Sequence, residues 1–336
     1  MRKFVHYVLL FVCFFCLETQ LLQGNDVGTK IQLIKNEKRK KKNKIKQDRQ
    51  FRDNNEMTGR NYSEINSPPK IYDCFTFFNE LELLEIRLNE LDDVVDYFVL
   101  VEMDQTFQGT SKLMIFKENK QRFEKFLSKI IHIEVTDRIE FHNNPWEREK
   151  FQRDQILRAL HQCKDNDVIL VSDLDEIISH QAIPRIVEGL KQHPIVACHL
   201  DFFVYFLNAK EKNNGRIRPF AIQYGNLKNQ SVDDLRKCFI FHIPNPPPYE
   251  PYTIHDAGWH FCSMGGLTRF VQKLDAWSHT PENTPTITPE WRTQTFIDDS
   301  VKYSCDIIEI DATFPQFVVD HLNEYRQAGF VCERPQ

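Results

Sequence analysis

Apolar and polar positions follow two different periods along residues 71–207. Some short runs are almost continuously apolar, which is typical of strands buried on both faces of a sheet. Between them, apolar residues recur every three or four positions; Leu81, Leu84, Leu88 and Leu91, for example, share one helical face. The pattern predicts strands at 71–77, 96–103, 130–135, 167–172 and 195–207, and helices at 80–91, 118–129, 144–163 and 183–192.

The alternation of strands and helices predicts βαβ units and therefore an α/β fold. We expect a Rossmann-type mixed, mostly parallel sheet flanked by helices. Residues 208–336 are less regular and rich in proline and aromatic side chains. They are expected to form loops on the substrate side of the sheet, not a second independent core. In such sheets ligands bind beyond the carboxyl ends of the strands.

The first 22 residues have the pattern of a membrane-targeting segment. Two basic residues precede an apolar stretch from Phe4 to Leu17 that only His6 interrupts. The stretch is shorter than the ~20 residues of a typical spanning helix, and no small-x-small cleavage site follows it. These features favour a signal-anchor of a type II membrane protein, with the body of the chain in the secretory lumen. A cleaved signal peptide, which would release a secreted protein, is the alternative.

Residues 23–69 are polar, lack periodic apolar positions and are expected to form a basic, disordered stem. Within them, residues 35–52 contain ten Lys or Arg and two Asp or Glu, about +8 in charge. Because the whole chain carries −5, the rest carries about −13. An acidic body argues against nucleic acid as a partner. Hydrophobic residues make up 41% of the whole chain, which is enough for a buried core. Residues 70–336 are expected to form the globular, catalytic domain.

Two sequons, at Asn61 and Asn229, agree with a lumenal location, although such triplets also occur by chance. Seven cysteines lie outside the apolar segment and are widely spaced. This spacing fits one or two disulfides, not a disulfide scaffold, and no CxxC pair suggests a structural zinc site.

The predicted strand 167–172 runs directly into Asp173-Leu174-Asp175-Glu176. Two carboxylates at positions i and i+2 of an extended strand end are expected on the same side of the chain, where they repel each other unless a cation lies between them. Mn²⁺ or Mg²⁺ prefers oxygen ligands and can complete its shell with phosphate oxygens. The motif therefore suggests a nucleotide-diphosphate site. Taken alone, it fits a solvated strand end equally well.

Several segments together resemble glycosyltransferase family 17, which includes the enzymes that add bisecting N-acetylglucosamine to N-glycans. The segments are 71–102, 146–156, 167–177 and 257–266, with a weaker match at 273–285. They occur in the family's order and cover most of the predicted globular body. The resemblance implies a glycosyltransferase-A-like fold, a UDP-GlcNAc donor, a divalent cation and inversion at the anomeric carbon. It also implies a glycoprotein glycan acceptor, β-1,4 transfer to the core β-mannose, and a Golgi location.

The resemblance also implies roles for individual residues. Asp175 is expected to bind the cation, and His260 to complete its shell from the C-terminal side. Asp173 is expected to hold the ribose or a cation-bound water, while Glu176 either orients the loop or is simply exposed. Glu102, Arg148 and Arg153 are the expected contacts to the donor nucleotide and its diphosphate.

An inverting transfer needs a general base, usually Asp or Glu. The candidates are Asp201, Asp256, Asp298 and Asp299. Asp256 is preferred because it is nearest to the segment containing His260. Stacking on a sugar ring is expected from one or two of the four tryptophans, which are Trp146, Trp259, Trp277 and Trp291.

Two other classes of protein compete with the transferase. A haloacid-dehalogenase-like phosphatase also places Asp-x-Asp after an apolar strand, but Glu176-Ile177 stands where that fold normally has a Gly-Thr-like turn. A non-catalytic lumenal sugar-binding protein on a transferase fold is the second alternative, and the presence of both Asp173 and Asp175 argues against it.

Overall fold

The computed structural model describes residues 68–137, 144–212, 216–241, 252–279 and 289–333. The predicted anchor (1–22), the predicted stem apart from 68–69, and the sequon at Asn61 lie outside these ranges. Asn229 of the second sequon is exposed, just after a short helix. Within the described ranges, no helix has both the length and the hydrophobicity needed to cross a bilayer.

The described chain alternates strands with α-helices and 3-10 helices (η). The strands are β1 (Ile71–Phe77), β2 (Tyr97–Met103), β3 (Ile130–Val135), β4 (Val168–Asp173), β5 (Glu176–Ile178), β6 (Ile195–Val204), β7 (Ala209–Glu211), β8 (Arg216–Gln223), β9 (Tyr252–Ile254), β10 (Gly258–Cys262) and β11 (Cys305–Ile307). The α-helices are α4 (Leu81–Leu91), α5 (Ile115–Glu118), α6 (Pro145–Asp154), α7 (Ile183–Leu190), α8 (Tyr224–Leu227), α9 (Val232–Phe241), α10 (Gly266–Ala276), α11 (Gln294–Ser304), α12 (Gln316–Asp320) and α13 (Leu322–Gln327). The 3-10 helices are η3 (Lys120–Phe126), η4 (Gln155–Ala159), η5 (His180–Ala182) and η6 (Pro289–Arg292).

One mixed sheet organises the fold. Its main order is β11-β7-β6-β8-β4-β1-β2-β3. The block β4-β1-β2-β3 is parallel, as predicted from the βαβ pattern. Beyond β4, however, β8 pairs antiparallel with both β4 and β6, and β7 pairs antiparallel with β6 and β11. The sheet is therefore mixed. Outside this block only the pairs of β6 with β9 and β10 are parallel among the described strands, so the prediction of a mostly parallel sheet is correct only in part.

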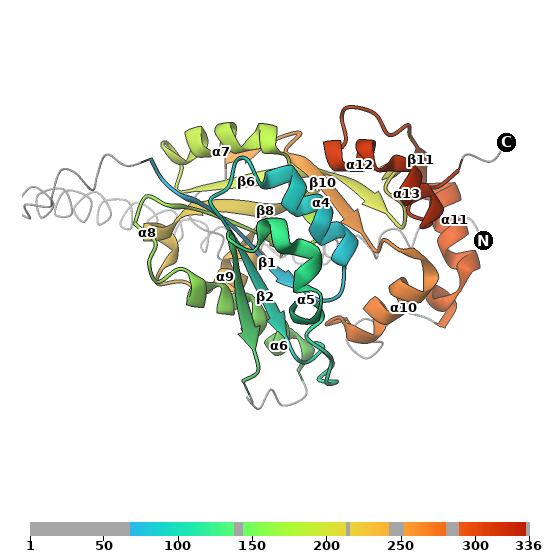
Figure 1. Ribbon diagram of the computed structural model, residues 1–336, viewed down its shortest axis with the longest axis horizontal. Helices are drawn as coiled ribbons and strands as arrows, with labels where there is room; N and C mark the ends of the chain where they lie inside the picture. Colours follow the sequence, from blue (N-terminus) through green and yellow to red (C-terminus); the bar gives the residue numbers. More distant parts are fainter. Residues whose placement is uncertain (1–67, 138–143, 213–215, 242–251, 280–288, 334–336) are drawn as a thin grey trace, which may run out of the picture. The chain divides into compact units, whose positions relative to one another are not determined.

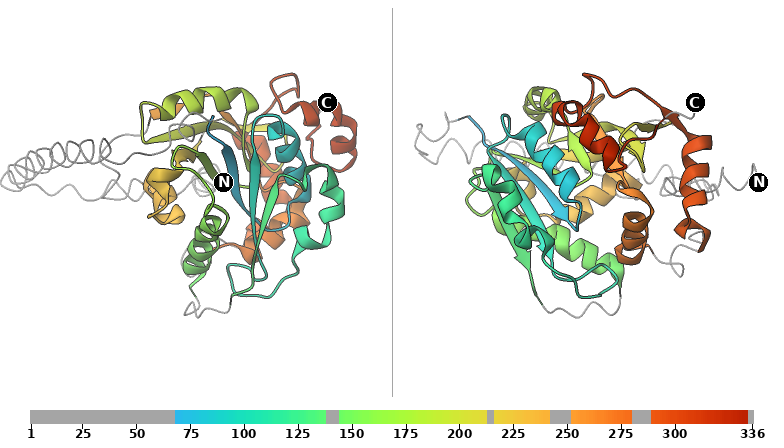
Figure 2. Two further views of the ribbon diagram at one scale, coloured as in Figure 1. Left: turned by 60° about the vertical axis from the view of Figure 1, so that its left-hand side comes forward. Right: turned by 45° about the vertical axis from the view of Figure 1, so that its right-hand side comes forward.

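Helices cover both faces of the parallel block, so its strands are buried on both sides. Figures 1 and 2 show α4 and α7 on one face, and α6, α8 and α9 on the other. Alternate residues of one strand enter two different hydrophobic cores. Phe75 and Phe77 pack with residues of α4 and α7, whereas Tyr72 and Cys74 pack with residues of η4, α8 and α9. This two-sided burial explains the continuous apolar runs in the sequence.

The strand register brings several polar side chains to the same edge of the sheet. Thr76 near the end of β1 is paired with Asp173 at the end of β4, and Phe77 is paired with Glu102 of β2. The loops that follow β1, β2 and β4 therefore all emerge at this carboxyl edge, where ligands bind in open α/β sheets.

The C-terminal part is more regular than predicted. Strand β10 pairs parallel with β6 and antiparallel with β5, so it belongs to the sheet. Two further hydrophobic cores form around it. One joins Leu83 and Ile177 to Phe314 and Tyr325, and the other surrounds Trp291. The prediction of loops alone is wrong for this region, because its short strands and helices lack the long periodic runs that sequence patterns detect.

Two predicted helices are interrupted. The predicted helix 118–129 is divided into α5 and η3 at Asn119, whose side chain donates a hydrogen bond to the Ile115 carbonyl and ends α5. The predicted helix 144–163 is α6 followed by η4. At this junction the Asp154 carboxylate accepts hydrogen bonds from the Ser231 hydroxyl and the Asp233 amide, which tie it to the start of α9.

The expected disulfides are not formed among the cysteines that can be placed. Six are free: Cys74, Cys163, Cys198, Cys262, Cys305 and Cys332. Burial raises the pKa of the Cys198 thiol to about 12 and contributes most to raising that of Cys305 to a similar value. These two thiols therefore behave as small core residues.

Candidate active site

The loop after β4 is fixed by a buried arginine of α4. Arg87 of α4 donates hydrogen bonds to the carbonyl oxygens of Asp173 (2.9 Å), Leu174 (3.2 Å) and Glu176 (3.0 Å). Its remaining nitrogens bind both carboxylate oxygens of Asp73, at 2.7 and 2.6 Å. Arg87 and Asp73 are completely buried. The sequence contained a signal for this role, because Arg87 lies on the apolar face of its helix.

Asp173 is held by two arginines from the helices below the sheet. Arg153 of α6 donates to its Oδ1 (3.0 Å), and Arg236 of α9 donates to its Oδ2 (2.6 Å). Burial alone would raise the pKa of the Asp173 carboxyl, but the two guanidinium groups outweigh it and hold the pKa well below its usual value. Arg153 also binds the carboxylates of Glu149 and Asp233. It therefore braces Asp173, and a contact to a donor diphosphate stays a prediction.

Glu176 orients the loop. Its side chain is completely buried, accepts a hydrogen bond from the Asp173 amide (2.9 Å) and pairs with Arg236 (2.9 Å). Of the two roles left open by the sequence, the structure supports the orienting one.

Asp175 points away from these arginines, toward β10 and α10. Leu174 and Asp175 form a turn between β4 and β5, so the alternation of an extended strand does not apply. Lys273 donates to Asp175 Oδ2 (2.9 Å), and His260 Nε2 lies 3.5 Å from Oδ1. The expectation that Asp173 and Asp175 share one cation is not supported, because each carboxylate has its own set of partners.

The charges around Asp175 are strongly coupled. Burial opposes ionisation, yet Lys273 and His260 lower the pKa of the Asp175 carboxyl far below its usual range. In return, Asp175 overcomes the effect of burial on His260 and raises the pKa of its ring to about 9. Burial would also lower the pKa of Lys273, and Asp175 contributes most to raising it instead. The site is thus an anionic centre with two cationic neighbours.

Cys262 joins Asp175 and His260 in a possible metal site. One ligand atom from each residue lies within 4.8 Å of the others. A cation with ligands about 2.1 Å away holds neighbouring ligand atoms roughly 3 to 4 Å apart, so the 3.5 Å between Asp175 Oδ1 and His260 Nε2 fits one. Sequence reasoning missed Cys262, although it lies two positions after His260 on a strand and so shares its side.

Burial alone would raise the pKa of the Cys262 thiol. Lys273 and His260 outweigh this effect and lower the pKa below its usual value. A more readily ionised thiol is a better metal ligand. The chemistry of the three side chains therefore agrees with their spacing.

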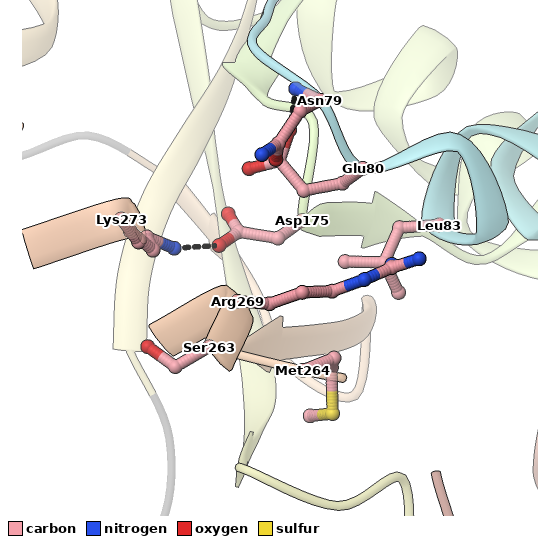
Figure 3. A pocket seen from close by; sticks show the side chains of 8 residues that line it. All are labelled: Asn79, Glu80, Leu83, Asp175, Ser263, Met264, Arg269 and Lys273. Atoms are coloured by element: carbon pink, nitrogen blue, oxygen red, sulfur yellow. Dashed lines mark hydrogen bonds and ion pairs between the residues drawn. The ribbon is translucent and has the colours of Figure 1, made fainter. Parts of the chain in front are cut away.

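A small pocket, partly open to solvent, lies beside Asp175. Its lining residues come from the loop after β1, from α4, from the loop after β4, and from the end of β10 and α10. They are Asn79, Glu80, Leu83, Asp175, Ser263, Met264, Arg269 and Lys273 (Figure 3). Of these residues, sequence reasoning had identified only Asp175.

The turn before α10 supplies Ser263 and Met264 to this pocket and contains two glycines. Gly265 and Gly266 have φ values of +93° and +79°, which favour glycine. A Cβ atom on Gly265 would lie 2.3 Å from the Arg269 side chain. Glycine is therefore the residue that this turn requires at both positions.

Glu102 and Arg148 have structural partners at this edge. The Glu102 carboxylate is completely buried, accepts from the Phe116 amide (2.9 Å) and lies 3.1 Å from His132 Nε2. It anchors α5, and the cofactor-binding role stays a prediction for this residue. Arg148 donates to the Phe107 carbonyl (2.9 Å) and packs against Gly109, whose φ is +87°. It fixes the loop 106–109, and its contact to a nucleotide stays a prediction.

The preferred general base is not at the site. Asp256 is exposed and precedes β10, and its carbonyl accepts a hydrogen bond from Arg185. Because β10 runs in the same direction as β6 and β4, Asp256 lies at the opposite end of the strand from Cys262. It is four residues before His260, about 13 Å along an extended strand. The prediction for Asp256 is therefore wrong.

The remaining candidates for the base also lie elsewhere. Asp201 is paired with Lys210 (2.7 Å), while Asp298 and Asp299 are exposed on α11. Trp259 and Trp291 are buried in the core. Trp146 and Trp277 both contact the His279 ring, with centroids 4.7 and 5.0 Å apart, and they remain candidates for stacking on a ligand.

Comparison with known proteins identifies relatives of the chain. Human and rat β-1,4-mannosyl-glycoprotein 4-β-N-acetylglucosaminyltransferase are each 27% identical over 232 residues, which is 64% of this chain. The chain spans only about two fifths of their length, 42% and 41% respectively.

Among solved structures, S. aureus TarS 1-349 matches at 12% identity with a TM-score of 0.35, over 70% of this chain and 72% of that one. The mannosyltransferase PcManGT from Pyrobaculum calidifontis, in complex with GDP-Man and Mn²⁺, matches at 12% identity with a TM-score of 0.33, over 78% and 83% of the two chains.

The model of glycosyltransferase family 17 matches residues 1–231. The match covers more than half of the chain and includes Asp173 and Asp175. The phosphatase alternative is therefore set aside. This chain belongs to glycosyltransferase family 17.

Proposed function

We propose that the protein transfers N-acetylglucosamine from UDP-GlcNAc to a glycan, with inversion and with the help of a divalent cation. The acceptor we infer is the core β-mannose of an N-glycan, in β-1,4 linkage. Family membership and the named relatives support the reaction class. The observation that carries the proposal is the cluster of Asp175, His260 and Cys262 at the carboxyl edge, beside Lys273.

Each residue of this cluster has a task in the proposed reaction. Asp175, His260 and Cys262 would hold Mn²⁺ or Mg²⁺, which when bound neutralises a diphosphate leaving group. Lys273 adds a fixed positive charge at the same place. The Arg87 brace below the loop keeps the Asp175 backbone in position without substrate, so little reorganisation is needed on binding.

The test uses the full chain and UDP-GlcNAc as the only donor. We expect UDP release that requires Mn²⁺, stops with EDTA and is lost in Asp175→Ala. Asp306→Ala is the matched control, because Asp306 is an exposed carboxylate on the edge strand β11. Binding of UDP-GlcNAc without any turnover would contradict the proposal and favour the sugar-binding alternative.

We also propose that the protein is a Golgi type II membrane protein, with residues 1–22 as its anchor and the enzyme in the lumen. The exposed Asn229 supports this proposal, because glycosylation there requires a lumenal site. The test is digestion with peptide N-glycosidase after expression in cells. A mobility shift that is smaller in Asn229→Gln, in a chain that stays with the membranes, is expected. A chain recovered from the medium would contradict the anchor.

A further inference from the structure

Glu80 lies where the loop after β1 meets the first turn of α4. Strands β1 and β4 are neighbours, and Thr76 of β1 pairs with Asp173 of β4, so their following loops are adjacent. Glu80 and Asp175 are the two carboxylates that line the pocket described above. In Figure 3 both carboxylates lie on the side of the pocket where Lys273 enters.

The Glu80 carboxylate has few partners. Its Oε2 accepts one hydrogen bond, from the Asn79 amide at 3.0 Å, and the side chain is half-buried. Glu80 occupies the N-cap position of α4, but its side chain makes no capping hydrogen bond. The carboxylate is instead turned toward the pocket, where it can accept a proton.

The neighbouring carboxylates are committed to other tasks. Both oxygens of Glu82 bind Arg269. Asp173 is held by two arginines, and Glu176 is completely buried. Asp175 is the proposed cation ligand. Among the lining residues of this pocket, Glu80 is therefore the carboxylate left to act on an acceptor.

Two cationic side chains, Lys273 and Arg269, line the same pocket as Glu80. Burial alone would lower the pKa of Lys273. Asp175, Cys262 and Glu80 together outweigh burial and raise the pKa, so the side chain stays positively charged. The hydrogen bond that Arg269 donates to Glu82 and, more weakly, the charge of Glu80 raise the pKa of Arg269. Glu80 is thus within electrostatic reach of two permanent cations that line the same pocket.

We propose that Glu80 is the general base of the transfer and that the pocket beside Asp175 receives the acceptor hydroxyl; this assignment rests on the proposed function. Glu80 takes the proton of the hydroxyl as its oxygen forms a bond to the anomeric carbon. The bond between that carbon and the diphosphate oxygen breaks, and its electron pair leaves with UDP. Glu80 then returns the proton to solvent. Lys273 lies on the side where the negative charge of the diphosphate develops.

The experiment compares two acceptors that differ in their need for a base. Water must lose a proton when it attacks UDP-GlcNAc, whereas azide ion has no proton to lose. The full chain, Glu80→Gln and the control Glu85→Gln are incubated with UDP-GlcNAc and Mn²⁺, with and without sodium azide. UDP and N-acetylglucosaminyl azide are quantified separately, and UDP affinity is measured by calorimetry. Glu85 is the matched control because it lies on α4 and pairs with Arg122, outside the pocket.

For Glu80→Gln we expect the rate with water to fall by about 10²- to 10⁴-fold, with UDP affinity unchanged. The rate of azide product formation should be that of the unchanged chain, since this acceptor needs no base. A fall of the azide rate in parallel with the water rate, or retention of the water rate, would overturn the assignment of Glu80. If the unchanged chain releases no UDP and forms no azide product, the proposed function is wrong and the assignment falls with it.

Discussion

Arg87 and Asp73 form a two-bond ion pair that is completely shielded from solvent beneath the loop carrying Asp173 and Asp175. The same guanidinium group donates to three carbonyl oxygens of that loop. One side chain therefore joins the first helix of the fold to the geometry of the candidate active site.

Replacing Arg87 with Met should lower the free energy of unfolding by about 3–5 kcal/mol, because it leaves the Asp73 carboxylate buried without a partner. The measurement is urea denaturation followed by circular dichroism. Arg122→Met is the control; it removes the more exposed pair with Glu85 and should cost at most about 1 kcal/mol. An equal decrease in the free energy of unfolding of the two variants would contradict a larger contribution from the buried pair.

Cobalt binding should report directly on Cys262. If its thiolate is a ligand, Co²⁺ added to the full chain gives a sulfur-to-metal charge-transfer band in the near ultraviolet. We expect Cys262→Ser to lose this band and Cys163→Ser to keep it, because Cys163 lies beside Tyr72, at the start of β1 and away from the carboxyl edge. Identical spectra from both variants would remove Cys262 from the metal site.

His260 should make stability depend on pH when no metal is bound. Burial lowers its pKa, but Asp175 raises it further, so the folded value is about 9 against 6.5 for an ordinary histidine. The resulting stabilisation is complete below pH 6.5 and is lost as the pH rises through 9. At about 1.4 kcal/mol per unit, it amounts to about 3 kcal/mol.

The measurement is urea denaturation in EDTA at several pH values between 6 and 9.5. The unchanged chain should lose this stabilisation over that range, while His260→Gln, which has no titrating group there, should not. Parallel pH profiles for the two proteins would contradict the coupling between His260 and Asp175.

Glu102 should act on stability and not on donor binding. Replacing it with Ala leaves the buried Phe116 amide without its acceptor and should lower the free energy of unfolding by about 2–3 kcal/mol. The UDP affinity of the folded protein, measured by calorimetry, should stay unchanged. Glu134→Ala is the control, since its pair with Lys117 is largely exposed. Loss of UDP affinity in Glu102→Ala alone would support the nucleotide-binding role predicted from the sequence.

The sequence predicted the parallel block well because each of its strands is buried on both faces. Val168–Asp173, for example, reads as an unbroken apolar run that ends in carboxylates. The short strand β10 has no such run, and its place in the sheet depends on pairing with β5 and β6, which are distant in sequence. Local patterns therefore reveal the first half of the fold much better than the second.

The same distinction holds for the candidate site. Asp175 could be found because a strand and a motif lead to it, and His260 because it lies in a recognisable segment. Lys273 and Glu80 carry no local signal, since a charged residue on a helix or in a loop is ordinarily solvated. Asp256 was chosen for its nearness to His260 in sequence, but an extended strand places neighbours four positions apart at opposite ends.

The ion pair between Asp175 and Lys273 joins residues 98 positions apart. During synthesis, which adds about 5–20 residues per second, Asp175 leaves the ribosome several seconds before Lys273 does. The parallel block and Arg87 are made first, whereas the basic partner of Asp175 arrives only with α10. The candidate pocket is therefore among the last parts of the protein to be completed, and a nascent chain ending before α10 would have the parallel block but not the basic partner of Asp175.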